Sequence, residues 1–346
     1  TVFLKKLFLK TPKIIWHFSW LPSNKRKLIK RESPDIIHLN WVNAGFFSLF
    51  DIGKIKQPII WTMHDSWNFT AGCHIPGDCQ MFEKNCSSCP LIKKSFSKII
   101  PKVFISIKKQ LYKKKKIIFV TPSHWLKKEA LKSSLMREQD IRVIPNGLDV
   151  DKYKLYEKKK IKSDFGIPRD KKIILFGGSR AKTDKNKGYD LFLEAYSKLN
   201  NQESYFVCLF GDADDRRDRE IKHYKNFGFI TEHEELNKLY CLADVYITTS
   251  RSESFGLTIV ESLCCNTPVV AFNVGGVSDI IDHKINGYLA EPFNMNDIKN
   301  GLVFVEKNMS GTEVNTRQNI VEKFSLTRIR EQYISLYKKL LSEKAS

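Results

Sequence analysis

Ser252-Glu-Ser-Phe-Gly-Leu-Thr-Ile-Val-Glu-Ser262 is the most informative segment of this sequence. An apolar run typical of a strand, from Val245 to Ser250, leads into it. An amphipathic run typical of a helix, from Leu257 to Leu263, leads out of it. The stretch therefore predicts a strand, a tight turn and a helix, with Glu253 in the turn and Glu261 on the helix.

The start of this predicted helix has the chemistry of a phosphate site. The backbone N–H groups from Phe255 to Thr258 have no partner within the helix, and such groups bind phosphate. A carboxylate in the turn and another along the helix can then reach hydroxyls on either side of that phosphate. A sugar nucleotide has this order of groups: sugar, diphosphate, ribose. The alternative is two solvated glutamates, since the helix dipole favours acids near its start.

The segment resembles the E-x7-E motif of retaining glycosyltransferases with the GT-B fold, in particular family 4, the group 1 glycosyltransferases. The strand Thr267–Ala271 and the turn Gly275–Asp279 match the same family in order and spacing. The resemblance implies that Glu253 faces the donor sugar and that Glu261 faces the ribose. It also implies that the turn residues hold the donor diphosphate through their amides: Phe255, Gly256 and Leu257.

Alternating short apolar and longer amphipathic runs predict an α/β fold with parallel sheets. The expected strands are 36–39, 58–63, 117–121, 141–144, 172–176, 205–210, 245–249 and 268–272. The expected helices are 44–50, 95–112, 123–135 (with Ser123 as its N-cap), 189–199, 234–242, 257–263 and 278–281.

The length of 346 residues allows two domains. The turn cluster at Pro145–Asp149 and the new series of strands and helices from Lys171 predict a boundary near 150–165. The domains expected are 1–158 on the acceptor side and 159–323 on the nucleotide-sugar side, both Rossmann-like and facing a cleft. The last segment, 324–346, is expected to be a helix that crosses back onto the first domain.

One family feature is missing from the start of the chain. Family 4 enzymes begin with a strand and a glycine-rich turn near the donor, yet the first 35 residues contain no glycine. The first strand and its loop are therefore expected to be missing. No signal-peptide pattern is visible at the start. The chain also lacks an initiator Met, which suggests a fragment or a processed product.

The net charge of +20 lies entirely in the first part of the chain. Residues 1–160 hold 32 Lys and Arg against 12 Asp and Glu, whereas residues 161–346 hold 26 of each. This asymmetry favours an anionic partner, and the alternative is a solvated lysine-rich face. An anionic membrane surface or a polyprenyl diphosphate acceptor fits better than nucleic acid, because no nucleic-acid-binding signature is visible. The basic clusters are at 25–27, 30–31, 93–94, 108–109 and 113–116.

His64 and Asp65 follow an apolar strand, at the sheet edge where ligands bind in open α/β sheets. The run from Trp67 to Cys73 resembles a subset of family 4 enzymes from polysaccharide and O-antigen pathways. The resemblance implies that His64 lies beside the reacting sugar. Asp65 is expected to support it by orienting its ring. The alternative is a histidine satisfied by local backbone groups.

A second phosphate element is expected where the strand at 172–176 ends. Gly177 and Gly178 follow this strand, and Lys187-Gly188 precedes a helix. The resemblance implies that Lys187, together with Arg180, neutralises the leaving diphosphate. It also implies that the backbone of Phe229 and Ile230 reads the nucleobase of a UDP- or GDP-sugar.

Four cysteines lie close together in the first half of the chain. Cys73, Cys79, Cys86 and Cys89 form a C-x5-C-x6-C-x2-C pattern. Such a pattern can hold a structural zinc ion, and the alternative is reduced thiols packed in a loop. No catalytic metal is expected, because the protein supplies the positive charge itself.

The resemblance implies a retaining glycosyltransferase that moves a hexose to a glycan or lipid-linked glycan in cell-surface polysaccharide or lipopolysaccharide synthesis. Glu253, His64 and Lys187 are the expected catalytic residues. The expected location is the cytoplasm, peripherally at the inner face of the membrane. Two alternatives stay open: a noncatalytic or truncated GT-B scaffold that binds nucleotide sugars, and a basic nucleic-acid-binding protein.

Overall fold

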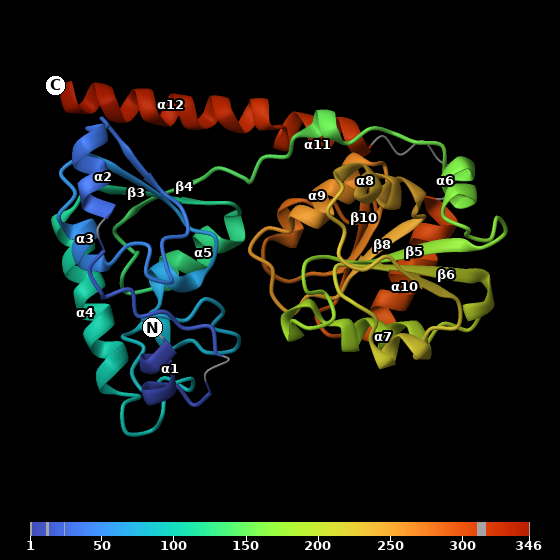
Figure 1. The fold of residues 1–346 in the computed structure, drawn as a ribbon, viewed down its shortest axis with the longest axis horizontal. Helices are drawn as coiled ribbons and strands as arrows, with labels where there is room; N and C mark the ends of the chain where they lie inside the picture. The colour runs from blue at the N-terminus through green and yellow to red at the C-terminus, as the bar shows by residue number, and fades with distance from the viewer. Residues whose placement is uncertain (1, 12–13, 24, 310–315, 346) are drawn as a thin grey trace. The chain divides into compact units, whose positions relative to one another are not determined.

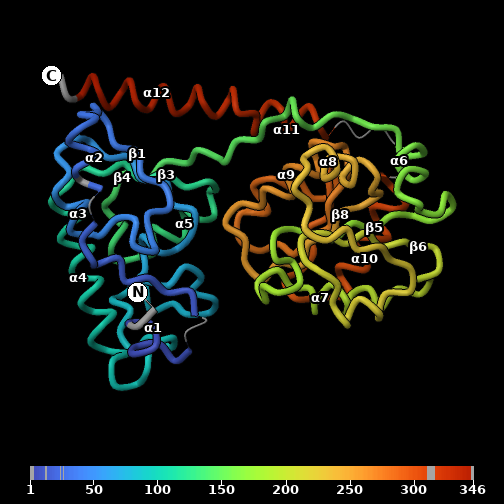
Figure 2. The backbone as a smooth tube through the Cα atoms, viewed as in Figure 1, coloured from blue at the N-terminus to red at the C-terminus, as the bar shows by residue number. Residues whose placement is uncertain are grey.

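The computed structural model describes residues 2–11, 14–23, 25–309 and 316–345. The chain forms two compact units, one of Thr1–Pro145 with Gln332–Ser346 and one of Asn146–Glu331. Each unit contains one parallel sheet (Figure 1). The chain leaves the first unit after Pro145 and returns to it through its last helix (Figure 2). The expected α/β class with two parallel sheets is confirmed.

The N-terminal unit is built on four parallel strands in the order β1-β2-β3-β4. Their bounds are Ile37–Leu39, Ile59–Thr62, Ile117–Thr121 and Asp140–Val143. Every residue of β2 and β3 is buried, as expected of central parallel strands covered on both faces. Among the described residues no strand precedes β1, and the chain starts instead with helix α1 at Val2–Phe8.

Several helices surround this sheet, and two of them, α3 and α5, begin at side-chain caps. They are α2 (Lys25–Glu32), α3 (Leu49–Gly53), α4 (Ile99–Lys114) and α5 (His124–Lys132), with short 3₁₀ turns at Ser66–Phe69 and Met81–Glu83. The Ser123 side chain accepts a hydrogen bond from the Leu126 N–H and caps α5, as predicted. A capping box between Ser48 and Asp51 starts α3.

The C-terminal unit has a six-stranded parallel sheet in the order β10-β9-β8-β5-β6-β7. This is the Rossmann order, in which the sequence of strands reverses between β5 and β8. The strands are β5 (Lys172–Gly177), β6 (Tyr205–Phe210), β7 (Tyr224–Asn226), β8 (Val245–Thr248), β9 (Val269–Phe272) and β10 (Gly287–Ala290). All eight strands expected from the sequence are present, and the short edge strands β7 and β10 were missed.

Helices cover both faces of this sheet (Figure 1). One apolar cluster includes residues of α7 (Tyr189–Ser197) and α10 (Met295–Asn308). A second cluster joins residues of four helices, α6 (Lys158–Asp164), α8 (His233–Leu242), α9 (Leu257–Cys264) and α11 (Thr316–Phe324). A buried ion pair, Lys182 Nζ to Asp218 Oδ2 at 2.6 Å, lies in the loops beyond β5 and β6.

Two helix predictions were wrong in detail. Only residues 49–50 of the expected helix at 44–50 are helical, because α3 begins at Leu49, where Ser48 supplies the N-cap. The expected helix at 278–281 is replaced by a 3₁₀ turn at Gly275–Asp279, which begins where Gly275 packs against the Glu253 carbonyl.

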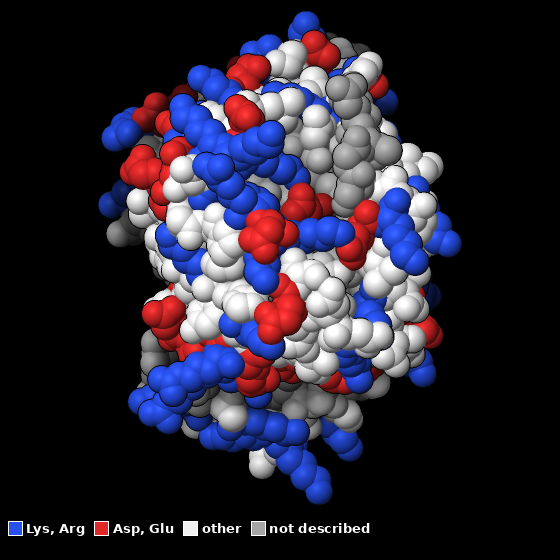
Figure 3. All heavy atoms as spheres, turned by 90° about the vertical axis from the view of Figure 1, so that its right-hand side faces the viewer, with Lys and Arg blue, Asp and Glu red and all other residues white. Residues whose placement is uncertain are grey.

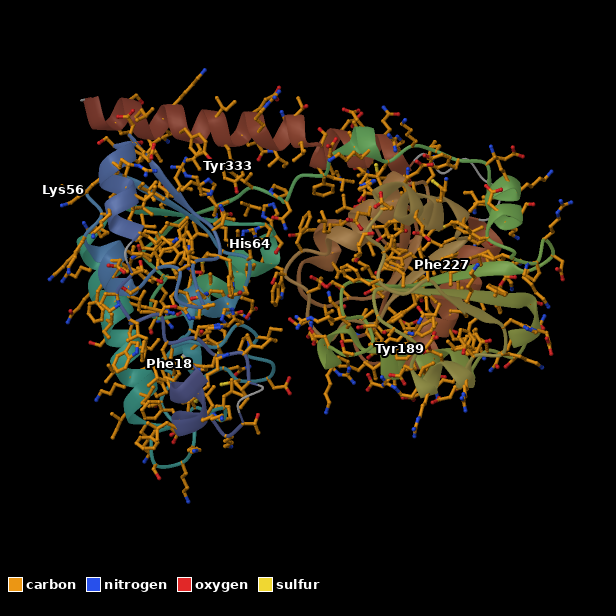
Figure 4. All side chains as sticks on the ribbon, in the orientation of Figure 1. Phe18, Lys56, His64, Tyr189, Phe227 and Tyr333 are labelled. Carbon is orange, nitrogen blue, oxygen red and sulfur yellow. The ribbon has the colours of Figure 1, made fainter. Side chains whose placement is uncertain are left out.

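The last helix, α12, spans Leu326–Ala345. Its residues from Gln332 onward belong to the N-terminal unit. Tyr333, labelled in Figure 4, places its hydroxyl 3.1 Å from Thr62 Oγ1 of β2. No helix in the described ranges is both long and apolar enough to span a membrane.

Candidate functional site

A cavity of about 210 Å³ lies at the point where the strand order of the C-terminal sheet reverses. Its lining comes from the carboxyl ends of β5 and β8, the loop after β5 and the first residues of α9. Open α/β sheets bind ligands at this kind of position, where the loops after two neighbouring strands diverge. The sheet topology therefore predicts a ligand site here independently of any motif.

Lys187 and Glu253 line this cavity and form an ion pair, with Nζ 3.0 Å from Oε2. Both side chains are only partly exposed. Because an opposite charge already lies beside it, each group is positioned before a ligand arrives. The pair presents a cation and a carboxylate to the same space, which suits a ligand with both phosphate and hydroxyl groups.

Two glycines hold this pair in place. Gly275 has a φ of +63°, and a Cβ there would lie 1.9 Å from the carbonyl oxygen of Glu253. The neighbouring Gly276 N–H donates to that same carbonyl at 2.8 Å. Gly188, after Lys187, packs equally closely on the carbonyl oxygen of Thr249. Only glycine allows these approaches, so the glycines fix the backbone on which Lys187 and Glu253 stand.

The start of α9 supplies a further wall of the cavity through Leu257 and Thr258. Gly256 precedes the helix with a φ of +107° and lets the chain turn into it. Phe255 is 2% exposed and packs against Phe324 at 5.6 Å between ring centroids, so it anchors the turn while its side chain points away from solvent. The Ile259 and Val260 N–H groups donate to the Gly256 carbonyl, so the N–H groups of Leu257 and Thr258 are the first-turn amides expected to bind an anion.

Glu261 does not line this cavity, although it lies four residues further along α9. Its carboxylate accepts a hydrogen bond from the Tyr240 hydroxyl at 2.7 Å. Burial raises the pKa of the Glu261 carboxyl, and hydrogen bonds from Tyr240 and Tyr153 oppose that rise. The structure therefore separates the environments of the two acids in the motif.

Five other residues expected at the donor site also lie outside the lining of the cavity: Phe255 and Gly256 of the turn before α9, and Arg180, Phe229 and Ile230. Arg180 is exposed, with a left-handed φ of 57°. Phe229 is 71% exposed in the loop after β7, and Ile230 is half-buried beside it. That loop is held to the loop after β6 by a hydrogen bond from the Gly211 N–H to the Gly228 carbonyl at 2.7 Å.

His64 and Asp65 lie in the N-terminal unit directly after β2 (His64 is labelled in Figure 4). His64 Nε2 is 3.0 Å from Asn40 Oδ1. Burial lowers the pKa of His64, and the nearby Asp65 opposes that shift. The ring is therefore held by Asn40 and kept neutral at pH 7.

The structure does not bear out the expected orientation of the His64 ring by Asp65. Asp65 Oδ1 accepts the Trp67 N–H at 2.8 Å, and Asp65 Oδ2 is 2.6 Å from His74 Nδ1. Its carboxylate is thus engaged with the turn that it caps and with a different histidine. The sequence analysis missed His74 and Asn40, because neither is adjacent to its partner along the chain.

The predicted zinc site is not supported. Across the described parts of the chain, no three His, Cys, Asp or Glu side chains converge as metal ligands, and all four cysteines are free. Burial raises the pKa of Cys73 to about 12 and that of Cys86 to about 11, so these thiols are protonated when no metal is bound. The Ala71 N–H also donates to Cys86 Sγ at 3.3 Å. Cys73, Cys86 and Cys89 pack in the apolar core instead, and Cys79 is half-buried.

Two family models match the chain. The model described as Glycosyltransferase Family 4 matches residues 2–152, and the model described as Glycosyl transferases group 1 matches residues 157–323. The second match contains the cavity and all the residues that line it.

Two curated proteins are similar in sequence. An uncharacterized glycosyltransferase of Methanocaldococcus jannaschii, MJ1607, is 28% identical over 63% of this chain and 59% of its own length. An uncharacterized 41.2 kDa protein in the cps region of Klebsiella pneumoniae is 27% identical over 96% of this chain and 87% of its own length. The chain therefore spans less than two thirds of the first relative and most of the second.

A solved structure similar in fold is that of HepE from Anabaena in complex with UDP. Its TM-score is 0.68 at 16% sequence identity, with 91% of this chain and 81% of that chain covered. This likeness, with the two parallel sheets, confirms the predicted GT-B fold.

Proposed function

This chain belongs to the GT-B glycosyltransferases, with a family 4 domain followed by a group 1 domain, and on that basis we propose that it transfers a hexose from a nucleoside diphosphate sugar. The observation that carries the proposal is the cavity where Lys187, Glu253 and the start of α9 meet. The donor diphosphate binds Lys187 and the first-turn amides of α9. The Glu253 carboxylate accepts hydrogen bonds from hydroxyl groups of the donor sugar.

The proposed chemistry is transfer with retention of the anomeric configuration. The bond between the anomeric carbon and the diphosphate breaks, the acceptor hydroxyl bonds to the same face of that carbon, and its proton passes to the departing diphosphate. Lys187 stabilises the negative charge that develops on the leaving group, and such preorganised electrostatics is usually the largest catalytic term. His64, neutral at pH 7, hydrogen-bonds a sugar hydroxyl during transfer.

The proposed acceptor is a glycan or lipid-linked glycan in cell-surface polysaccharide synthesis, of the O-antigen or lipopolysaccharide type. The cps region that gives the Klebsiella relative its name supports this context. The proposed location is the inner face of the cytoplasmic membrane, with the basic N-terminal unit on the anionic lipids. UDP is the proposed nucleotide, supported by the UDP complex of HepE.

The test combines nucleotide binding with transfer. UDP and GDP are titrated against the chain in a thermal-shift assay, and transfer is measured with a panel of UDP- and GDP-sugars. Lys187→Ala is expected to lower kcat/KM by about 100-fold or more, because it removes the cation next to the leaving group. Glu253→Ala is expected to lose transfer while keeping nucleotide binding.

Lys185→Ala is the matched control, since Lys185 lies on the same 3₁₀ turn but is exposed and does not line the cavity. It is expected to behave like the native chain. Full activity in both Lys187→Ala and Glu253→Ala would refute the site. Nucleotide binding without transfer of any sugar would favour a noncatalytic scaffold instead.

A further inference from the structure

Three hydrogen-bonded side chains in the N-terminal unit, those of Asp65, His74 and His17, have no part in the proposed donor site, and we call them the Asp65–His74–His17 triad. Asp65 Oδ2 lies 2.6 Å from His74 Nδ1, and His74 Nε2 lies 2.7 Å from His17 Nδ1. His74 is 5% exposed, whereas His17 is half-buried and is the member of the triad nearest the surface. Backbone hydrogen bonds hold both histidines: the His17 N–H donates to the Gly72 carbonyl at 2.9 Å, and the Ser66 N–H donates to the His74 carbonyl at 3.0 Å.

The hydrogen bonds of the Asp65–His74–His17 triad have one consistent direction when both imidazole rings are neutral. A carboxylate only accepts hydrogen bonds, so the proton of His74 sits on Nδ1 and points at Asp65. His74 Nε2 is then a lone pair, and it must accept the proton carried by His17 Nδ1. The remaining nitrogen, His17 Nε2, is left as a lone pair that accepts hydrogen bonds.

Burial lowers the pKa of His17 to about 4, with His74 and Lys5 adding to the shift and Asp65 opposing it. His17 is therefore neutral under ordinary conditions. No side chain in the described residues hydrogen-bonds its Nε2. His17 Nε2 is thus an uncharged hydrogen-bond acceptor rather than a cation. Binding of a phosphate group there is disfavoured, and binding of a hydroxyl group is favoured.

An exposed aromatic ring lies beside this acceptor. Trp41 is 48% exposed and packs edge-on against His17, with ring centroids 5.5 Å apart. It also contacts His74, at 5.9 Å between centroids. Trp41 directly follows Asn40, whose side chain holds His64. The ring therefore stands at the same edge of the sheet as the histidine expected at the reacting sugar.

A flat apolar ring next to a hydrogen-bond acceptor is complementary to a pyranose, whose C–H face is apolar and whose rim carries hydroxyl donors. We propose that Trp41 and His17 form a subsite for a neutral sugar ring of the acceptor. The C–H face stacks on the Trp41 indole, and a sugar hydroxyl donates to His17 Nε2. Asp65 and His74 are positioning residues that set the direction of that hydrogen bond. As an acceptor subsite, the inference rests on the proposed function.

Saturation-transfer NMR on the full chain tests the binding, with methyl glycosides of glucose, galactose, mannose and rhamnose as probes and with UDP present. At least one glycoside is expected to give signals from its ring C–H protons. Trp41→Ala is expected to lose them, Trp41→Phe to keep them, and His17→Ala to weaken them. Trp20→Ala is the matched control, because Trp20 is another exposed tryptophan of this unit, and it is expected to keep the signals.

Signals that persist in Trp41→Ala, or the absence of signals from every glycoside, would overturn the subsite. The UDP titration keeps this result separate from the proposed function. A chain that binds UDP without binding glycosides loses only the subsite. A chain that binds glycosides at Trp41 but binds no nucleotide retains the sugar site and loses the donor assignment.

The direction of the hydrogen bonds is tested by long-range ¹H–¹⁵N NMR of the histidine rings at pH 8, where free imidazole is neutral. His17 is expected to carry its proton on Nδ1. Asp65→Asn places an amide donor at His74 Nδ1. This is expected to reverse the direction of both hydrogen bonds of the triad and to move the His17 proton to Nε2. A native His17 protonated on Nε2, or an Asp65→Asn chain with an unchanged tautomer, would show that the carboxylate does not set the direction.

Discussion

At the scale of one residue, Lys108 shows that a lysine from a basic cluster in the sequence can be buried in the structure. It belongs to a basic pair with Lys109, yet it is fully buried in the N-terminal unit. Its Nζ donates to the backbone carbonyls of Trp67 and Thr70 and lies 3.5 Å from the centre of the Trp67 ring. Burial lowers the pKa of Lys108 to about 7 from its ordinary 10.5.

This shift predicts a pH dependence of stability. Between about pH 7 and about pH 10 the unfolded chain holds the Lys108 proton and the folded chain does not, so stability rises with pH in this window. The slope is at most about 1.4 kcal/mol per pH unit. The free energy of unfolding of the native chain, minus that of Lys108→Met, is expected to rise accordingly in urea titrations. Lys102→Met, exposed on the same helix, is the control. A difference that does not change with pH would mean that the buried amine keeps its proton.

At the scale of elements, α12 is attached to the N-terminal sheet by polar contacts as well as by apolar packing. Tyr337 Oη lies 2.7 Å from His38 Nδ1, and His38 Nε2 lies 2.8 Å from Thr62 Oγ1. Tyr333 Oη approaches the same Thr62. Leu336 and Leu340 are buried alongside these tyrosines. The helix is therefore held to β1 and β2 by a network in which each polar group has a partner.

Removing one hydroxyl from this network is expected to loosen the helix. Tyr337→Phe leaves His38 Nδ1 without its partner and is expected to cost about 1–3 kcal/mol of stability. Hydrogen exchange of the α12 amides and urea unfolding measure the effect. Ser335→Ala is the control, since Ser335 is exposed on the same helix, and it is expected to change neither. Unchanged exchange in Tyr337→Phe would mean that apolar packing alone holds α12.

At the scale of the whole molecule, charge is distributed unequally between the two units. Figure 3 shows a face on which Lys and Arg are interspersed with Asp and Glu, in keeping with the balance of 26 basic and 26 acidic residues over 161–346. In the N-terminal unit, α4 exposes Ile99, Val103 and several lysines on one face while its other face is buried. Such a face suits an anionic lipid surface.

The chain is therefore expected to sediment with vesicles that contain anionic lipid, and more weakly as salt rises. Replacing the exposed α4 residues Lys102, Lys109 and Lys113 by Glu is expected to weaken binding by about 100-fold, since each lysine near the surface contributes about 1 kcal/mol. The same change at Lys160, Lys185 and Lys307 of the C-terminal unit is the matched control. Equal loss in both variants, or binding that salt does not affect, would exclude a specific basic face.

The α/β class, eight of the ten strands in the described residues and the strand–turn–helix unit around Glu253 were predictable from the sequence, because these depend on periodicity and turn residues within a few positions. The structure does not support the metal site expected at the cysteines, and Asp65 contacts His74 instead of orienting His64.

Only the tertiary structure decided which of these residues meet. The burial of Lys108, the link from Asp65 through His74 to His17, and the separation of Glu261 from the cavity all join residues from different elements. Their contacts depend on how strands and helices pack, and the local pattern of the chain does not encode that packing.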